Sequence, residues 1–226
     1  MLKQQNTKIL NLLQQSPLFR GMQLSQIQQL LTLLGGVVQS VGKGQVIMPQ
    51  GQVAQHMGVV LQGLVVIGHS DAWGNHTVLG SAAPGEAFAE AYAVQRQQPM
   101  LVCVTAAEDS QVLLLQPPSA GDSTQLPLLQ HFSANLLQVC AAKSLQLSER
   151  IVHTAPKGIR RRLLSYFSGC AQQAGSNQFD IPFTRQQLAD YLGVDRSAMC
   201  SEMSKMQREG LIVYRKNHIA LVHPGK

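Results

Sequence analysis

Residues 184–209 read TRQQLADYLGVDRSAMCSEMSKMQRE and decide the fold of the last third of the chain. Thr184 is followed three residues later by Gln187, the spacing of a capping box, which predicts that a helix begins at the next residue. Gly193 supplies the positive φ of a tight turn, and Asp195 is the predicted N-cap of a second helix. The stretch therefore predicts two short helices joined by a tight turn.

The second predicted helix has one apolar and one polar face. Its methionines recur at the i, i+4, i+7 spacing of a buried stripe, at Met199, Met203 and Met206. The outer face carries hydrogen-bonding side chains, namely Arg196, Ser197, Ser201, Ser204 and Arg208. A helix-turn-helix with such a face is suited to reading base edges in DNA, although an ordinary helical hairpin in a core would show the same caps and stripe.

Two short strands are predicted directly after this hairpin. Gly210 is expected to end the second helix, and residues 211–214 and 219–222 are rich in β-forming apolar residues. The segment between the strands contains Arg215 and Lys216, so the hairpin tip is basic. A helix-turn-helix followed by a basic β-hairpin is a winged helix-turn-helix, which favours DNA binding over the core-hairpin interpretation.

Charge is divided unequally along the chain. Residues 1–153 contain seven Lys and Arg against seven Asp and Glu, whereas residues 154–226 contain eleven against five. The formal net charge of +6 therefore comes entirely from the last third. Because this excess coincides with the predicted winged helix-turn-helix, it indicates double-stranded DNA as the partner.

The remaining composition is that of a globular protein of 226 residues, long enough for two domains. No apolar run approaches the roughly 20 residues of a membrane-spanning helix, and the N-terminus lacks a signal-peptide core, so we expect a cytoplasmic protein with no membrane partner. The cysteines, Cys103, Cys140, Cys170 and Cys200, lie singly and do not predict a metal site. No nucleophile–base constellation or phosphate-binding glycine motif is present, so an enzyme is not expected.

The first half of the chain predicts helices followed by strands. Residues 2–34 carry two helical patterns separated by Ser16-Pro17, the second with a predicted cap at Ser25. From Val37 onward, short apolar stretches alternate with glycine-containing turns. This alternation indicates a sandwich or barrel of about eight strands.

A long helix is predicted over residues 126–153. Apolar residues recur near the 3-4 spacing of a packing seam, at Leu129, Phe132, Leu136, Val139, Leu147 and Ile151. About 28 helical residues span about 40 Å, more than one domain requires, so we expect the seam to pair with a second copy of the chain. Residues 154–158 then interrupt the helix with Pro156 and Gly158 and are a predicted hinge. The basic run 160–162 after it is expected to be a solvated face with some reach to phosphates.

The order of these elements resembles the Crp/Fnr family of bacterial transcription regulators. The landmarks in the strand region are KGQVI at 43–47, QGQ at 50–52, VLQG at 60–63 and PGEAFAE at 84–90. The most specific segment is residues 177–205, and the resemblance covers nearly the whole chain. It implies an α+β fold with a β-roll (double-stranded β-helix, jelly-roll-like) sensor domain at 1–125, a dimerisation helix at 126–153 and a winged helix-turn-helix at 154–226.

The resemblance implies a homodimeric, effector-controlled transcription regulator that binds specific DNA sequences and also contacts RNA polymerase. It places Arg185 at a phosphate contact and Arg196 at a base-reading position. Family members commonly carry glutamate and arginine where this chain has Ser197 and Ser201, so the operator cannot be copied from known half-sites. Arg208, Arg215 and Lys216 are expected to anchor phosphates.

The predicted effector pocket lacks the family's phosphate clamp. Cyclic-nucleotide-binding relatives use an Arg-Ser pair about ten residues after a glutamate that matches Glu90, and these two positions are Met100 and Leu101 here. A cyclic nucleotide is therefore disfavoured. It stays an alternative because Arg96 lies nearby and could replace the clamp. The expected pocket is apolar and is lined by Glu90, Met100, Leu101, Val102 and Cys103, with Cys140, Lys143 and Ser144 from the long helix.

Haem is an alternative occupant, as in family members that sense carbon monoxide or nitric oxide. Axial ligands would come from His56, His69, His76, His131, Cys103 or Cys140, and no spacing selects among them. A small organic effector, a redox change at a cysteine or no effector also stay open, whereas an iron–sulfur cluster is disfavoured by the missing N-terminal cysteine cluster. An alternative from a different functional class is a β-roll ligand-binding module whose C-terminal domain binds protein rather than DNA.

Overall fold

The computed structural model describes residues 2–71, 73, 76–118 and 127–222 of the chain. The chain divides into two compact units, residues 1–142 and 143–226, and each has a hydrophobic core of its own. In the described ranges, none of the helices has the length and apolar character needed to cross a membrane.

The first unit begins with the predicted helices. They are α1 (Leu2–Gln15), the short 3-10 helix η1 (Pro17–Phe19) and α2 (Leu24–Leu33). The Gln26 Oε1 atom accepts a hydrogen bond from the Gln23 N–H at 2.8 Å, so α2 begins before the predicted cap at Ser25. That prediction was wrong because a glutamine pair forms the cap two residues earlier, at Gln23.

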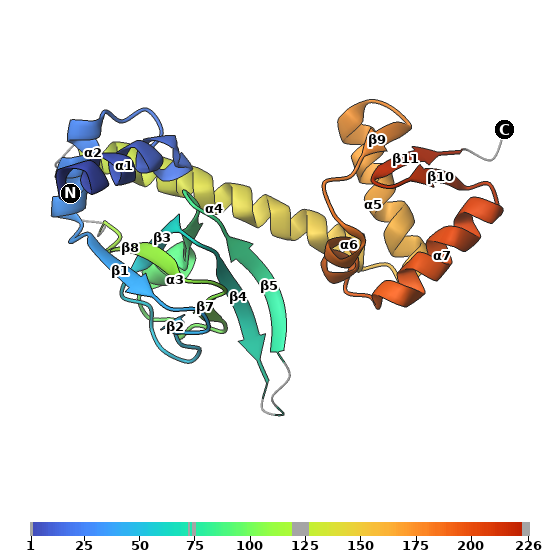
Figure 1. Ribbon diagram of the computed structural model, residues 1–226, viewed down its shortest axis with the longest axis horizontal. Coiled ribbons are helices and arrows are strands. Elements are labelled where there is room, and N and C mark those ends of the chain that lie inside the picture. Colours follow the sequence, from blue (N-terminus) through green and yellow to red (C-terminus); the bar gives the residue numbers. More distant parts are fainter. Residues whose placement is uncertain (1, 72, 74–75, 119–126, 223–226) are drawn as a thin grey trace. The chain divides into compact units, whose positions relative to one another are not determined.

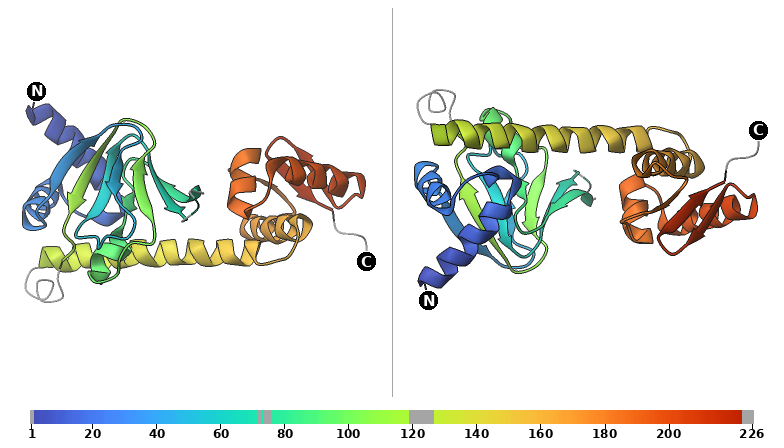
Figure 2. Two further views of the ribbon diagram at one scale, coloured as in Figure 1. Left: turned by 90° about the horizontal axis from the view of Figure 1, so that it is seen from below. Right: turned by 90° about the horizontal axis from the view of Figure 1, so that it is seen from above.

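Two four-stranded antiparallel sheets follow and form the predicted β-roll (Figures 1 and 2). In spatial order, the first contains β1 (Val37–Val41), β8 (Ser110–Leu115), β3 (Met57–Gln62) and β6 (Ala87–Phe88). The second contains β2 (Val46–Met48), β7 (Cys103–Ala106), β4 (Val65–Ser70) and β5 (His76–Ala82). The α+β prediction for this half of the chain is confirmed.

A glycine allows a close approach inside the first sheet. Gly58 pairs with Phe88 of the neighbouring strand, and a Cβ atom at position 58 would lie 2.0 Å from the Phe88 ring. The absent side chain makes room for the fully buried ring. Helix α3 (Glu90–Gln95) follows directly, so this packing also fixes the start of the segment predicted to line the effector pocket.

Helix α4 (Pro127–Thr154) is the predicted long helix, and its first half packs into the first unit. Leu129, Phe132 and Leu136 belong to the core of that unit. The Asn135 side-chain amide donates to the carbonyl oxygens of Leu18 and Arg20, both at 3.0 Å. The first part of the predicted intermolecular seam is thus an intramolecular contact, because the β-roll and the N-terminal helices cover it.

The second unit is a winged helix-turn-helix, as predicted. After α5 (Ile159–Ala174), it contains β9 (Gln178–Asp180), α6 (Arg185–Leu192), α7 (Arg196–Arg208), β10 (Ile212–Arg215) and β11 (His218–Leu221). The three strands pair antiparallel in the order β10-β11-β9. Met199, Met203 and Met206 are buried in its core, which confirms the methionine stripe.

Candidate DNA-binding surface and effector domain

Each helix of the helix-turn-helix begins with the cap that the sequence predicts. The Gln187 N–H donates to Thr184 Oγ1 at 3.3 Å, and the Gln187 side chain accepts from the Thr184 N–H at 2.9 Å. Gly193 has φ of 62°, and Asp195 Oδ1 accepts from the Ala198 N–H at 2.8 Å. These local bonds set where α7 begins and therefore which of its side chains face solvent.

The outer face of α7 is exposed and polar. Arg196, Ser197, Ser201 and Arg208 are all exposed, and no intramolecular hydrogen bond holds their side chains within the described chain. Ser204 differs, because its hydroxyl donates to the Cys200 carbonyl at 2.9 Å and lies 3.3 Å from the Tyr214 hydroxyl. Four of the five residues predicted on this face are thus available to a ligand.

Arg185 contacts the wing. Its Nη2 atom donates to the Lys216 carbonyl at 2.5 Å, and its guanidinium carbon lies 5.3 Å from the centre of the Tyr214 ring. Its Nη1 atom is buried without a hydrogen-bond partner. These contacts turn the guanidinium toward the wing, whereas Arg215 and Lys216 at the tip are exposed.

Only part of the basic run 160–162 is the solvated face that we predicted. Arg160 binds Glu209 of the segment after α7 at 2.7 and 3.1 Å and Glu202 within α7 at 2.5 Å. These hydrogen bonds lower the pKa of Glu209. Arg160 therefore fixes α5 to α7, and within the run only Arg161 has an exposed side chain.

Two further arginines bind the C-terminal end of α6. Arg162 Nη1 donates to the carbonyls of Leu192 and Gly193 at 2.9 and 3.1 Å, and its Nε donates to the Pro156 carbonyl at 3.0 Å. Arg150 of α4 donates to the Tyr191 and Asp190 carbonyls, both at 3.1 Å. Sequence reasoning missed these contacts, because nothing in the local pattern indicates which carbonyl an arginine reaches.

An aromatic cluster surrounds His153 near the end of α4. The His153 Nδ1 atom lies 2.8 Å from the Tyr191 hydroxyl, and its ring meets Tyr166 edge-on with centroids 5.4 Å apart. Gly169 makes room for the imidazole, since a Cβ there would lie 2.9 Å from His153 Nε2. Burial lowers the pKa of His153, and the Glu149 carboxylate partly offsets this effect.

The eight predicted effector residues differ in exposure, and they do not all belong to the same unit. Glu90 and Met100 are buried, at 5% and 2% exposure, whereas Leu101 is 64% exposed. Val102 and Cys140 are half-buried against the core of the first unit, and Cys103 is half-buried at the start of β7. The other two predicted residues, Lys143 and Ser144, belong to the second unit.

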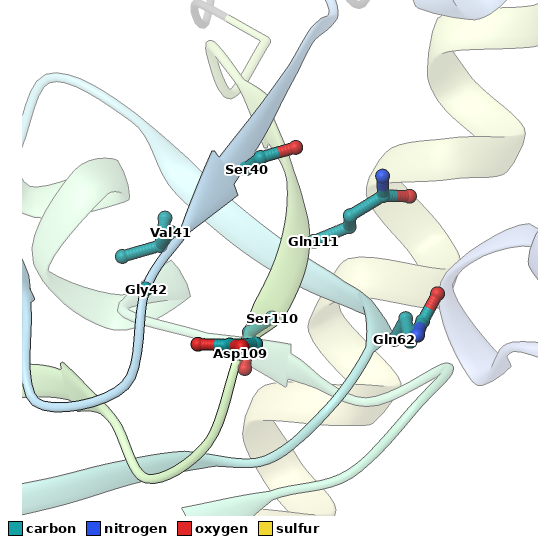
Figure 3. Close-up of a pocket in the computed structure, with 7 residues that line it drawn as sticks. All are labelled: Ser40, Val41, Gly42, Gln62, Asp109, Ser110 and Gln111. Atoms are coloured by element: carbon teal, nitrogen blue, oxygen red, sulfur yellow. The ribbon is translucent and has the colours of Figure 1, made fainter.

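A cleft of about 370 Å³ lies beside β1 and the start of β8, and none of the eight predicted effector residues lines it (Figure 3). Ser40 of β1 and Gln111 of β8 are directly paired there, and Asp109 lies near Gly42. Its lining residues contribute one carboxylate and no basic side chain. This chemistry is unsuited to a phosphate.

The basic residue closest to the missing clamp is already engaged. Arg96 has φ of 52° and donates from Nη2 to the Pro117 carbonyl at 2.8 Å. It is thus held by the chain segment that follows β8.

The candidate axial ligands differ in their surroundings. Because a carbonyl can only accept, the 2.8 Å contact between His69 Nδ1 and the Leu101 oxygen makes Nδ1 the donor, which leaves the lone pair on Nε2. His56 is half-buried and His131 is exposed, while the His76 side chain lies outside the described part. Within the described residues, no group of three His, Cys, Asp or Glu side chains gathers to hold a metal ion.

Comparison with known proteins matches both units of the chain. Residues 38–119 match the family model of the cyclic nucleotide-binding domain, and residues 159–226 match that of the Crp-like helix-turn-helix domain. None of the curated proteins matches the chain.

Several solved structures share the fold. The sensor domain of the transcriptional regulator DNR from Pseudomonas aeruginosa is 25% identical, with 67% of this chain and 95% of that chain covered and a TM-score of 0.50. FixK2 from Bradyrhizobium japonicum is 17% identical, with 82% and 92% covered and a TM-score of 0.51. CprK complexed with OCPA is 15% identical, with 86% and 88% covered and a TM-score of 0.56.

A domain of the cyclic nucleotide-binding fold joined to a winged helix-turn-helix with an exposed polar recognition face defines a DNA-binding transcription regulator with an effector-binding domain. The chain belongs to the Crp/Fnr family of transcription regulators.

The environment of His153 generates a prediction for its titration. In an NMR titration of the full chain, the His153 imidazole should titrate below the 6.5 of an exposed histidine, and Glu149→Gln should lower its pKa further. Since the unfolded chain then binds the proton more tightly, His153 should make the fold less stable as pH falls below about 6.5.

The His153 signal is identified by its absence from the spectrum of the His153→Gln variant. A His153 pKa above 6.5, or an upward shift on Glu149→Gln, would contradict the assignment of these contacts.

Proposed function

We propose that this chain works as a homodimer, in which an effector bound in the β-roll controls how two copies of α7 engage DNA. The observation that carries the proposal is the combination of a polar, exposed α7 face with an apolar stripe on α4 that its own chain does not cover. Two recognition helices separated by one turn of DNA require a two-fold dimer.

The exposed stripe on α4 has heptad spacing. Leu137 and Ile151 are two heptads apart and are 70% and 65% exposed, while Leu147 is 60% exposed. A heptad register places positions 137, 144 and 151 at a and positions 140 and 147 at d. Such an a/d pattern is typical of the seam of a two-stranded coiled coil. Exposed leucine and isoleucine at these positions support pairing with the same helix of a second copy.

Base reading is assigned to the exposed N-terminal half of α7. Arg196 would contact a guanine, and Ser197 and Ser201 would add hydroxyl contacts with less discrimination. Arg208, Arg215 and Lys216 would bind phosphates. Arg185 and Ser204 would act by holding the wing in place, because both already contact it.

The effector is proposed to be a molecule without a phosphate group. The similarity to the cyclic nucleotide-binding domain concerns the fold, whereas the ligand is selected by particular side chains. Met100 is buried in the core, Leu101 is apolar, and Arg96 is already bonded to Pro117. A cyclic phosphate would therefore lose its hydration without gaining a cationic partner.

DNA reading is tested on a duplex selected from a random library. Arg196→Ala should weaken binding to the selected duplex by about 1–3 kcal/mol and flatten the preference at one base pair. If each monomer neutralises about four phosphates, log affinity of the wild type should fall against log salt with a slope of about −7. Fluorescence anisotropy measures both quantities.

The matched control is Arg20→Ala, an exposed arginine in the first unit, which should leave both unchanged. Equal losses for the two variants would argue against a base contact, and a flat salt response would favour the alternative that this domain binds protein.

Dimerisation is tested by placing charge in the stripe. The double variant Leu147→Lys with Ile151→Lys should sediment as a monomer and lose most of its DNA affinity, because buried unpaired ammonium groups are costly. Val152→Lys is the control, since Val152 is 63% exposed but lies outside the a/d positions. A monomeric wild type, or a dimer that survives the double substitution, would overturn the homodimer.

Haem is a second candidate for the effector site, and one contact favours it. Histidines that ligate metals usually donate their other ring N–H to a carbonyl or carboxylate, which is the arrangement of His69 with Leu101. Haem would supply an iron centre able to bind diatomic gases.

The haem candidate predicts a specific spectrum. Protein expressed with excess haem should show a stoichiometric Soret band that shifts with carbon monoxide after reduction, and His69→Ala should remove it. His131→Ala should retain the band. A featureless wild-type spectrum would remove haem and leave the DNA-binding proposal intact.

A further inference from the structure

The second unit contains a cleft that no part of the proposed function uses. Its volume is about 690 Å³, within the range of small-molecule sites. The last turns of α4, helix α5, the segment after β9 and the end of α6 contribute to its walls. All of these lie within residues 143–226, so the cleft is a property of one unit.

Aromatic rings from three elements form one wall. Phe183 lies with its ring centre 5.2 Å from that of Tyr191 and 6.0 Å from that of Tyr166. The centres of the two tyrosine rings are 5.5 Å apart. Tyr166 is only 5% exposed, whereas Phe183 and Tyr191 are half-buried, so these two rings are the ones a ligand can reach. The π faces of aromatic rings attract cations.

The charged groups in the cleft are acidic. Glu149 and Asp180 contribute carboxylates, and among the described lining residues there is no lysine or arginine. His153 also lines the cleft, but burial favours its neutral form. Arg150 lies over the Tyr191 ring at 5.7 Å, yet its guanidinium is bonded to α6 carbonyls and it is not a lining residue.

The cleft stays accessible when the proposed contacts form. Gln146, Glu149 and His153 recur three and four residues apart, so they share one face of α4. This face lies away from the a/d positions of the proposed seam, where Leu147 and Ile151 project. The exposed α7 residues proposed to read DNA are not among the lining residues either.

We propose that this cleft binds a small organic cation with an aromatic or alkyl body. The ammonium group would lie against the Tyr and Phe rings with Glu149 and Asp180 as counter-charges, and the apolar body would fill the space beside Tyr166 and Phe183. Anionic effectors, including nucleotides, are excluded by the same carboxylates. A ligand here touches α4, α5 and α6 together, so it ties the end of the long helix to the helix-turn-helix.

The proposal is tested on the full chain with 2-phenylethylammonium as the probe. Phenylacetate has the same ring with the opposite charge and is the matched control. Amide chemical shifts should move saturably with the amine at residues 146–153, 166–174 and 179–183, and phenylacetate should bind at least tenfold more weakly. Equal binding of the two compounds, or shifts confined to other residues, would overturn the proposal.

Three variants separate the charge and ring contributions. Glu149→Gln and Asp180→Asn should each weaken amine binding about fivefold, the effect of a partly exposed ion pair. Phe183→Leu keeps an apolar side chain but removes a π face, and should also weaken binding several-fold. Glu108→Gln, an exposed carboxylate of the first unit, is the control and should bind like the wild type.

Circular dichroism checks that each variant folds. If another variant fails to fold, Glu149→Gln still tests the site, because Glu149 is an exposed residue of α4. An equal loss with Glu108→Gln would show a non-specific charge effect and would refute the site. The measurement uses neither DNA nor a β-roll effector. A negative result would therefore leave the proposed function unaffected, and failure of the proposed function would leave the cleft proposal unaffected.

Discussion

The last carbonyl groups of a helix have no partner within that helix, and in α6 this constraint organises the second unit. Arg150 and Arg162 satisfy four successive carbonyls, from Asp190 to Gly193. The two arginines come from different helices, α4 and α5, and Arg162 also holds Pro156 of the segment between them. The turn of the helix-turn-helix is therefore bonded directly to the end of the long helix.

This bonding gives a physical route from α4 to the DNA-reading helix. His153 contacts Tyr191 beside the same carbonyls, and Arg160 joins α5 to Glu202 and Glu209 around α7. A change at the last turns of α4 would thus be felt at α6 and α5 without any loop acting as intermediary. The acidic aromatic cleft lies along this route, which is why a ligand there would bear on DNA binding.

In the first unit, the residues that hold the fold together differ from those at the predicted clamp positions. The β-roll depends on sheet pairing and on close packing such as Phe88 against Gly58, and neither involves the effector. The clamp positions, in contrast, hold Met100 and Leu101, one buried and one exposed. Different residues therefore determine the fold and select the ligand, and the family match concerns only the fold.

The sequence by itself determined the elements whose causes are local. The Thr184–Gln187 capping box, the Asp195 cap, the methionine stripe of α7 and the basic wing follow from spacings within one or two turns. Tertiary structure alone decided the roles of Arg150, Arg160, Arg162 and Arg185, whose hydrogen-bond partners, apart from Pro156, lie 30 to 49 residues away. It likewise decided that Leu129, Phe132 and Leu136 pack within the chain. The reason is physical: caps and helical periods are short-range, whereas a long cationic side chain takes whichever carbonyl or carboxylate the packed fold brings within reach.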